Sequence, residues 1–159
     1  MILLVIQMTT DSIEDYLEAL NFIIKKKGYA KVKDIASYFD ISPSSVTEMF
    51  QKLEKQGFVN YEKYGGATLT KEGEKIAVNT RKKHDTIYQF LRIFDVPSDA
   101  ANEDACRIEH VVHKKTMLRL TQFVSFINKY EKKPKWLEHF QQYYTTGSMP
   151  DCERIETNK

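Results

Sequence analysis

The sequence predicts a mainly α-helical fold with a small β-hairpin, in which an N-terminal winged helix-turn-helix precedes an all-helical domain. Apolar residues recur at helical spacing through most of the chain, and a four-residue turn joins two short helical segments. Two strand-like runs then flank a Gly-Gly pair. This order of elements is more specific than any one of them, and an unrelated small α+β domain is the alternative.

The composition indicates an ordinary globular protein of one compact domain or two small ones. Of the 159 residues, 42% are hydrophobic and 29% are charged. The formal net charge is only +2, so any binding of nucleic acid must come from a local basic patch. Two cysteines, Cys106 and Cys152, cannot form a disulfide scaffold of the secreted kind, which favours a reducing cytoplasm. We expect Cys152 to be a free thiol.

The first residues carry no recognisable targeting segment. Residues 1–7 are apolar, but they lack a basic leader and fall far short of the roughly 20 residues that span a bilayer. Met8 precedes a favourable helix-capping run at residues 9–12. Translation could therefore start at Met8 and leave residues 1–7 as an extension without function.

Three helices are expected first. Residues 12–27 have apolar side chains at helical spacing, and a glycine follows them. A second, short helix covers residues 32–39. After a tight turn, Ser42 caps the third helix with Pro43 at its first position, and a Gln-Gly pair ends it. The second and third helices form the helix-turn-helix.

The hairpin and four further helices complete the predicted order. Strands at residues 58–64 and 67–70 flank the Gly65-Gly66 turn, and Thr70 caps a long helix that ends near Phe94. Ser98 or Asp99 caps a helix to about Val112, an amphipathic helix covers residues 116–130, and a short helix begins near Trp136. The expected domains are a winged helix at 1–74, an all-helical domain at 75–134, and a tail at 135–159.

Cys106, Glu109 and His110 are spaced so that all three side chains share one face if the segment is helical. Alone, this string favours a buried cysteine, a solvated carboxylate and an ordinary histidine. Further possible ligands elsewhere in the chain favour a metal site instead. Six residues from three predicted helices offer oxygen, nitrogen and sulfur donors, which together suit Mn(II), Fe(II), Co(II) or Zn(II). They are Asp15, Glu18, His84, Cys106, Glu109 and His110.

Six ordered strings in the chain resemble the diphtheria toxin repressor and manganese transport regulator family of metal-dependent transcriptional repressors. The strings are TTDSIEDYLE (9–18), KGYAKVKDIA (27–36), SPSSVTEMFQKLEKQGF (42–58), YEKYGGATLTKEG (61–73), KHDTIYQFLRI (83–93) and EDACRIEHVV (103–112). By this resemblance the family's metal ligands fall on the same six residues, and residues 75–134 are expected to be the helical metal-binding and dimerisation domain.

At two of these six positions the manganese sensors and the iron sensors of the family have different residues. Asp15 is the residue of the family's manganese sensors, whereas Cys106 is the residue of its iron sensors. Tyr88 and Asn102 occupy ancillary ligand positions and neither keeps the iron-type residue. A thiolate favours Fe(II), Co(II) and Zn(II), while two carboxylates favour harder ions. The expected co-repressor is Mn(II) or Fe(II), with Co(II) or Zn(II) as surrogates.

The resemblance implies a cytoplasmic homodimer that binds a palindromic operator in double-stranded DNA and represses genes for metal uptake. The third helix of a winged helix enters the major groove, and the wing and second helix reach phosphates. The expected DNA contacts are Lys31, Lys33, Ser44, Ser45, Thr47, Glu48, Gln51, Lys52, Lys55, Lys63 and Tyr64.

Two other functions remain open from the residues. One is a winged-helix regulator whose effector is not a metal. The other is a small metalloenzyme, because a carboxylate, an imidazole and a thiolate around an ion can activate water. The sequence has no evident phosphate loop or nucleophile elbow, so we do not expect an enzyme.

Overall fold

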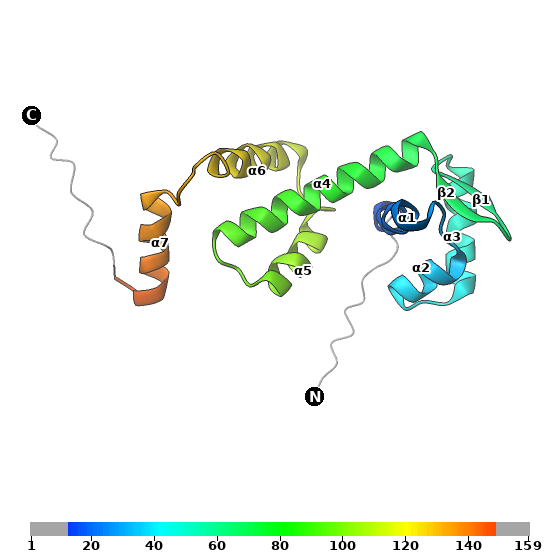
Figure 1. The fold of residues 1–159 in the computed structure, drawn as a ribbon, viewed down its shortest axis with the longest axis horizontal. Helices are drawn as coiled ribbons and strands as arrows, with labels where there is room; N and C mark the ends of the chain where they lie inside the picture. The colour runs from blue at the N-terminus through cyan, green and yellow to red at the C-terminus, as the bar shows by residue number, and fades with distance from the viewer. Residues whose placement is uncertain (1–12, 149–159) are drawn as a thin grey trace, which may run out of the picture. The chain divides into compact units, whose positions relative to one another are not determined.

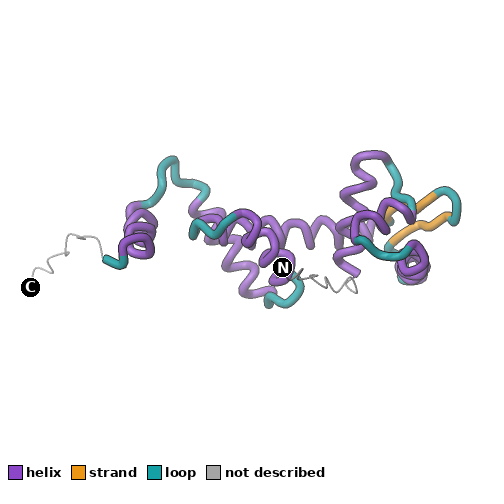
Figure 2. The backbone as a smooth tube through the Cα atoms, turned by 90° about the horizontal axis from the view of Figure 1, so that it is seen from below, coloured by secondary structure: helices purple, strands orange, loops and turns teal. Residues whose placement is uncertain are grey.

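The computed structural model describes residues 13–148, which form seven helices and one two-stranded antiparallel sheet (Figures 1 and 2). The chain divides into two compact units, one up to Lys83 and one from His84 onward. The mainly helical fold is as predicted, whereas the domain boundary after residue 74 stays a prediction. The expected helix cap at residues 9–12 and the thiol at Cys152 lie outside the described residues.

The first unit begins with the three predicted helices, α1 (Ile13–Lys27), α2 (Val32–Phe39) and α3 (Pro43–Lys55). The hydroxyl of Ser42 accepts the backbone N–H of Ser45 at 3.2 Å, with proline at the first helical position. This confirms the predicted cap. A capped start relieves one of the unpaired N–H groups of a helix, which stabilises it by about 1 kcal/mol.

The wing consists of β1 (Val59–Glu62) and β2 (Gly66–Leu69), paired in register from Val59 with Leu69 to Glu62 with Gly66. Ala30 extends the sheet, because its N–H and carbonyl pair with Ala67 at 2.9 and 2.7 Å. Gly66 has φ +102°, and a Cβ there would lie 2.8 Å from the Ala30 carbonyl oxygen. The close approach of the α1–α2 connection to the wing therefore requires glycine.

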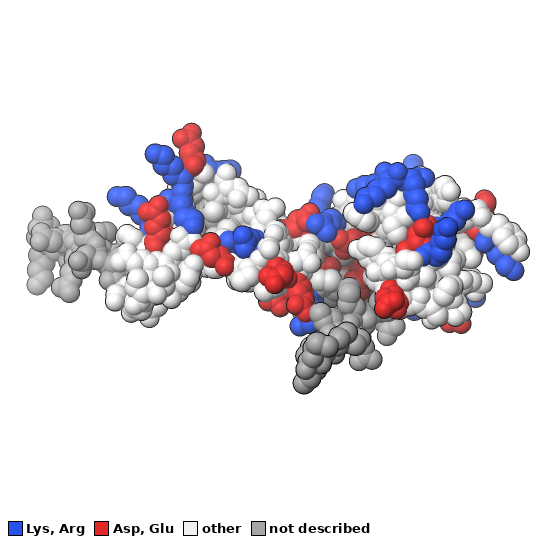
Figure 3. Space-filling view, turned by 60° about the horizontal axis from the view of Figure 1, so that its bottom comes forward, with Lys and Arg blue, Asp and Glu red and all other residues white. Residues whose placement is uncertain are grey.

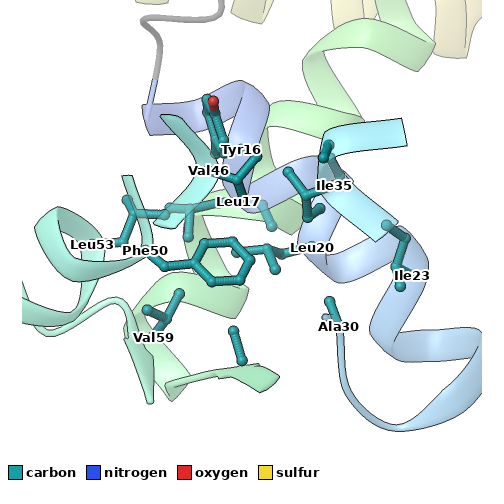
Figure 4. Packing of buried hydrophobic residues seen from close by; sticks show 14 residues of the cluster. Tyr16, Leu17, Leu20, Ile23, Ala30, Ile35, Val46, Phe50, Leu53 and Val59 are labelled. Atoms are coloured by element: carbon teal, nitrogen blue, oxygen red, sulfur yellow. The ribbon is translucent and has the colours of Figure 1, made fainter. Parts of the chain in front are cut away.

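Aliphatic and aromatic side chains from all three helices and the hairpin form the core of this unit (Figure 4). Leu17 and Leu20 of α1, Phe50 and Leu53 of α3 and Ile35 of α2 are fully buried. Each such side chain stabilises the fold by about 1.5–3 kcal/mol through burial. The position of α3 is consequently tied to α1 through shared packing.

Helix α4 (Lys71–Ile93) follows the wing and continues across the boundary between the units. Thr70 caps it, since its hydroxyl oxygen accepts the N–H of Gly73 at 3.2 Å, as predicted. The same hydroxyl donates to the Gly57 carbonyl at 2.7 Å. This joins the start of α4 to the segment that leads into β1.

The second unit contains the end of α4 with α5 (Ser98–Ile108), α6 (Lys114–Ile127) and α7 (Lys135–Thr146). A chain of aromatic rings joins the end of α4, α6 and α7, with successive centroids 5.1 to 6.4 Å apart. The rings are Phe90, Phe94, Phe123, Trp136 and Phe140. None of the described helices combines the length and apolar character needed to cross a bilayer.

Two predicted helix ends in the second unit are wrong. Pro97, not Ser98 or Asp99, is the capping residue of α5, and no side chain caps it. The helix also ends at Ile108 instead of about Val112. Val111 is 82% exposed, so the apolar periodicity that extended the prediction does not correspond to a buried face.

Candidate functional site

A buried carboxylate and two imidazoles lie together in the second unit. Glu109 is 1% exposed, and its Oε2 lies 3.0 Å from Nδ1 of His84 on α4. Its Oε1 lies 3.4 Å from Nε2 of His110. Removing a carboxylate from water is costly unless polar or charged groups surround it, and here the imidazoles supply them.

The end of α5 produces this arrangement. Glu109 follows the last helical residue and donates its backbone N–H to the Ala105 carbonyl at 3.1 Å. Its backbone angles remain helical (φ −58°, ψ −26°), so the helical spacing between Cys106 and Glu109 is kept. His110 approaches the carboxylate from the turn that follows.

Asn102, on α5, is a further neighbour of His84. Its Oδ1 lies 3.2 Å from Nε2 of the imidazole, whose other nitrogen faces Glu109. A metal ion bound at either ring nitrogen would have to replace one of these two interactions. Sequence reasoning placed Asn102 only at an ancillary position of a resembled family and gave no signal for this contact.

The donors of the second unit fit a divalent first-row transition ion. Two imidazoles and a carboxylate are close together, and the thiol of Cys106, on the last turn of α5, is half-buried and in no disulfide. Borderline nitrogen and sulfur donors beside an oxygen donor are the mixture such ions bind. The second unit thus brings His84, Glu109 and His110 together.

The other two candidate ligands, Asp15 and Glu18, lie one helical turn apart on α1 in the first unit, and both are half-buried. An oxygen of Glu18 lies 3.4 Å from a guanidinium nitrogen of Arg81 on α4. Glu14 similarly lies 3.3 Å from the ammonium of Lys83. Basic residues of α4 therefore balance part of the acidic charge at the start of α1.

A polar face of α3 meets the requirements of a DNA-reading helix. Val46, Phe50 and Leu53 are buried on the opposite side. The residues predicted to contact DNA from this helix are exposed, except for Thr47, which is half-buried. The exposed ones are Ser44, Ser45, Glu48, Gln51, Lys52 and Lys55. Donors and acceptors on one face of a helix can read base edges in a major groove.

Internal hydrogen bonds already engage some hydroxyl groups of this face. The Ser42 hydroxyl lies 2.8 Å from those of both Ser44 and Ser45. Thr47 donates its hydroxyl to the Pro43 carbonyl at 2.9 Å, so that oxygen has only acceptor capacity left for a ligand. Sequence reasoning did not foresee these constraints.

The predicted phosphate contacts Lys31, Lys33 and Lys63 are exposed, and Figure 3 shows Lys and Arg side chains gathered over the first unit, to the right in this view. Lys31 and Lys33 stand at the start of α2, where the helix dipole disfavours cations. At the tip of the wing Tyr64 is 89% exposed, and the Lys63 ammonium lies 5.8 Å from its ring centre. Cations held at positions unfavourable to the helix are available for an external anion.

Asp34 offsets the charge at the start of α2. It accepts the Lys31 backbone N–H at 2.7 Å and pairs with the Lys27 ammonium at 2.7 Å. Burial by itself would raise the pKa of Asp34, but these hydrogen bonds and the nearby lysine charges together hold that pKa below its ordinary value. The carboxylate is thus ionised and fully engaged at neutral pH.

The sequence matches two family models. Residues 8–67 match the iron dependent repressor, N-terminal DNA binding domain, and residues 70–137 match the iron dependent repressor, metal binding and dimerisation domain. The HTH-type transcriptional regulator MntR of Bacillus velezensis is 40% identical over 135 residues, which cover 85% of this chain and 95% of that protein.

Solved structures are similar as well. The manganese regulator SloR aligns with a TM-score of 0.62 and 30% identity over 72% of this chain and 54% of that one. ScaR with bound Zn2+ aligns with the same TM-score, identity and coverage. The present chain therefore spans about half the length of these two solved chains.

Proposed function

The chain belongs to the iron-dependent repressor family, and from this membership we propose that it represses genes for metal uptake with Mn(II) or Fe(II) as its co-repressor. The observation that carries the proposal is the placement of two different chemistries in the two units. A reading helix with a polar outer face lies in the first unit, and the cluster around buried Glu109 lies in the second.

We assign six metal ligands, two in the first unit and four in the second. They are Asp15, Glu18, His84, Cys106, Glu109 and His110. A bound divalent ion would supply positive charge that neutralises carboxylates of both units and joins the two ligand sets. The chain's own part is to hold Glu109 and its imidazoles in place before binding.

Helix α1 would transmit the effect of metal binding to the DNA-reading helix α3. Asp15 and Glu18 lie on the same helix as Leu17 and Leu20, which pack in the core with Phe50 of α3. Fixing α1 relative to the second unit would consequently fix the reading helix. In a homodimer this would hold two reading helices about one DNA turn (34–36 Å) apart, as a palindromic operator requires.

Selectivity for the ion rests on two opposing preferences. The Cys106 thiolate favours Fe(II), Co(II) or Zn(II), whereas the carboxylates of Asp15 and Glu18 favour Mn(II). Relatives named for manganese regulation support Mn(II) as the natural ion, and the structure of ScaR with bound Zn2+ supports Zn(II) as a surrogate. Because the Cys106 thiolate favours Fe(II), we propose Fe(II) as the alternative natural co-repressor.

The test is operator affinity measured against each ion. Duplexes selected from a random library by the metal-loaded protein provide the operator, and fluorescence anisotropy gives its affinity without metal and with Mn(II), Fe(II), Co(II) or Zn(II), under reducing, oxygen-free conditions. We expect Mn(II) or Fe(II) to raise operator affinity at least tenfold. Equal affinity with and without every ion would show that the effector is not a metal.

A further inference from the structure

A groove of about 610 Å³ lies between α1 and α2 in the first unit, and no proposed DNA or metal contact except Lys33 lines it. Apolar groups of Phe22, Ile23 and Tyr38 line it together with the lysines Lys26 and Lys33. Its volume is within the range of ligand-binding clefts. The feature is therefore large enough to hold one or two side chains of a partner.

The aromatic residues of the groove are unusually accessible. Phe22 is 49% exposed and Tyr38 is 53% exposed, and their ring centres lie 6.2 Å apart. The Lys26 ammonium lies 3.9 Å from the Phe22 ring centre. A cation against an exposed ring is common at protein interfaces, where aromatic anchors supply much of the binding energy.

The charge around the groove is positive. Lys27 and Asp34 pair with each other at 2.7 Å, so their charges offset. Within residues 13–148, no acidic side chain forms an ion pair with Lys26 or Lys33. Lys33 also lies in the first turn of α2, where the helix dipole disfavours a cation. The groove therefore presents two positive charges beside an apolar floor.

We propose that this groove binds an acidic segment of a partner protein, with one large apolar side chain against Phe22 and Tyr38 and flanking carboxylates near Lys26 and Lys33. Charge complementarity selects an acidic partner, and the exposed rings select an apolar anchor between the acids. A DNA backbone would satisfy the lysines but would offer no apolar group to the exposed surfaces of Phe22 and Tyr38. No residue of α3 lines the groove, so α3 itself stays available for DNA, whereas Lys33 cannot contact a DNA phosphate and a carboxylate of the partner at the same time.

The test uses the full chain and a fluorescein-labelled dodecapeptide of alternating Glu and Asp with one central Trp. A second peptide with Ala in place of Trp measures the contribution of the anchor. Fluorescence anisotropy gives both affinities at low salt, and we expect the Trp peptide to bind at least tenfold more tightly. Phe22→Ala should remove that difference, and Phe22→Tyr, which keeps a ring, should retain it.

Lys25 provides a matched control for charge. Lys25 and Lys26 both lie in the last turn of α1, but only Lys26 lines the groove. We expect Lys26→Glu to weaken Trp-peptide binding at least tenfold and Lys25→Glu less than twofold, while circular dichroism shows both variants folded. Operator affinity of Phe22→Ala should equal that of the unsubstituted chain.

Three results would overturn the proposal. The Trp and Ala peptides could bind equally, the two lysine variants could weaken binding equally, or Phe22→Ala could reduce operator affinity as much as it reduces peptide affinity. The last result would make the groove a DNA contact. Loss of metal-dependent operator binding with normal peptide binding would count against the proposed function alone.

Discussion

The two units differ in how they are stabilised. The first has a continuous core in which aliphatic side chains and Phe50 are almost completely inaccessible. The second unit buries Ile87, Leu137 and the side chain of Glu109, but its chain of aromatic rings is open to solvent at Trp136 and Phe140, which are 45% and 39% exposed. The aromatic cluster of the second unit is therefore more open to solvent than the core of the first unit.

The largest expected effect comes from a substitution in the core of the first unit. Phe50→Ala should lower the free energy of unfolding by about 3–5 kcal/mol, because it removes a fully buried ring and leaves a cavity. Phe140→Ala in the second unit should cost less than about 2 kcal/mol, since its ring already meets solvent. Urea denaturation measures both. Equal losses would remove the proposed difference between the units.

The next effect concerns the charge buried in the second unit. Glu109→Gln keeps the shape of the side chain but removes the negative charge beside His84 and His110. We expect Mn(II) affinity, measured by isothermal titration calorimetry, to fall about 100-fold or more, because a change at a ligand should cost at least as much as the 10–100-fold typical of changes at the neighbours of ligands. Glu103→Gln, on the exposed face of α5, is the control and should leave the affinity unchanged.

A smaller effect tests the attachment of the wing. Gly66→Ala should lower the free energy of unfolding by about 1–3 kcal/mol, because its φ of +102° is unfavourable for other residues and a Cβ would crowd the Ala30 carbonyl. Gly147→Ala is the control, since it has φ +71° with nothing within 4 Å of an added Cβ. A loss at Gly66 no larger than that at Gly147 would show that contact with Ala30 contributes nothing.

The smallest effect depends on pH. Asp34→Asn should reduce the free energy of unfolding by about 1 kcal/mol at neutral pH, through loss of the charged cap and the Lys27 pair. Because the folded pKa of Asp34 is lowered, its contribution is present above the ordinary value of 3.8 and is lost as pH falls through the folded pKa. The difference between the two proteins should therefore shrink below pH 3.8. A difference that stays constant there would contradict the assigned cause.

Local signals predicted most of the fold. Ser42 with Pro43 and Thr70 mark helix starts by hydrogen-bonding chemistry that involves only nearby residues, and the structure has caps at both. The end of α5 has no such signal. No glycine or proline follows Ile108 before the next helix, so apolar spacing through Val112 predicted a longer helix than the structure has.

The candidate site could likewise be predicted only where local spacing determines it. Spacing paired Cys106 with Glu109, and the helical backbone keeps that spacing. The contact of His84 with Asn102 and Glu109 joins residues of different helices, which only tertiary packing can bring together. The groove beside Phe22 also went unnoticed, because it arises from the packing of α1 against α2. The full six-ligand set stays a prediction.

The central claim is that the metal ligands and the reading helix are coupled. Calorimetric titration of Mn(II) into the protein, with and without saturating operator duplex, tests it most directly. Linkage requires operator to raise Mn(II) affinity by the same factor by which Mn(II) raises operator affinity. We expect at least a tenfold increase in Mn(II) affinity. An Mn(II) affinity that operator DNA leaves unchanged would contradict it.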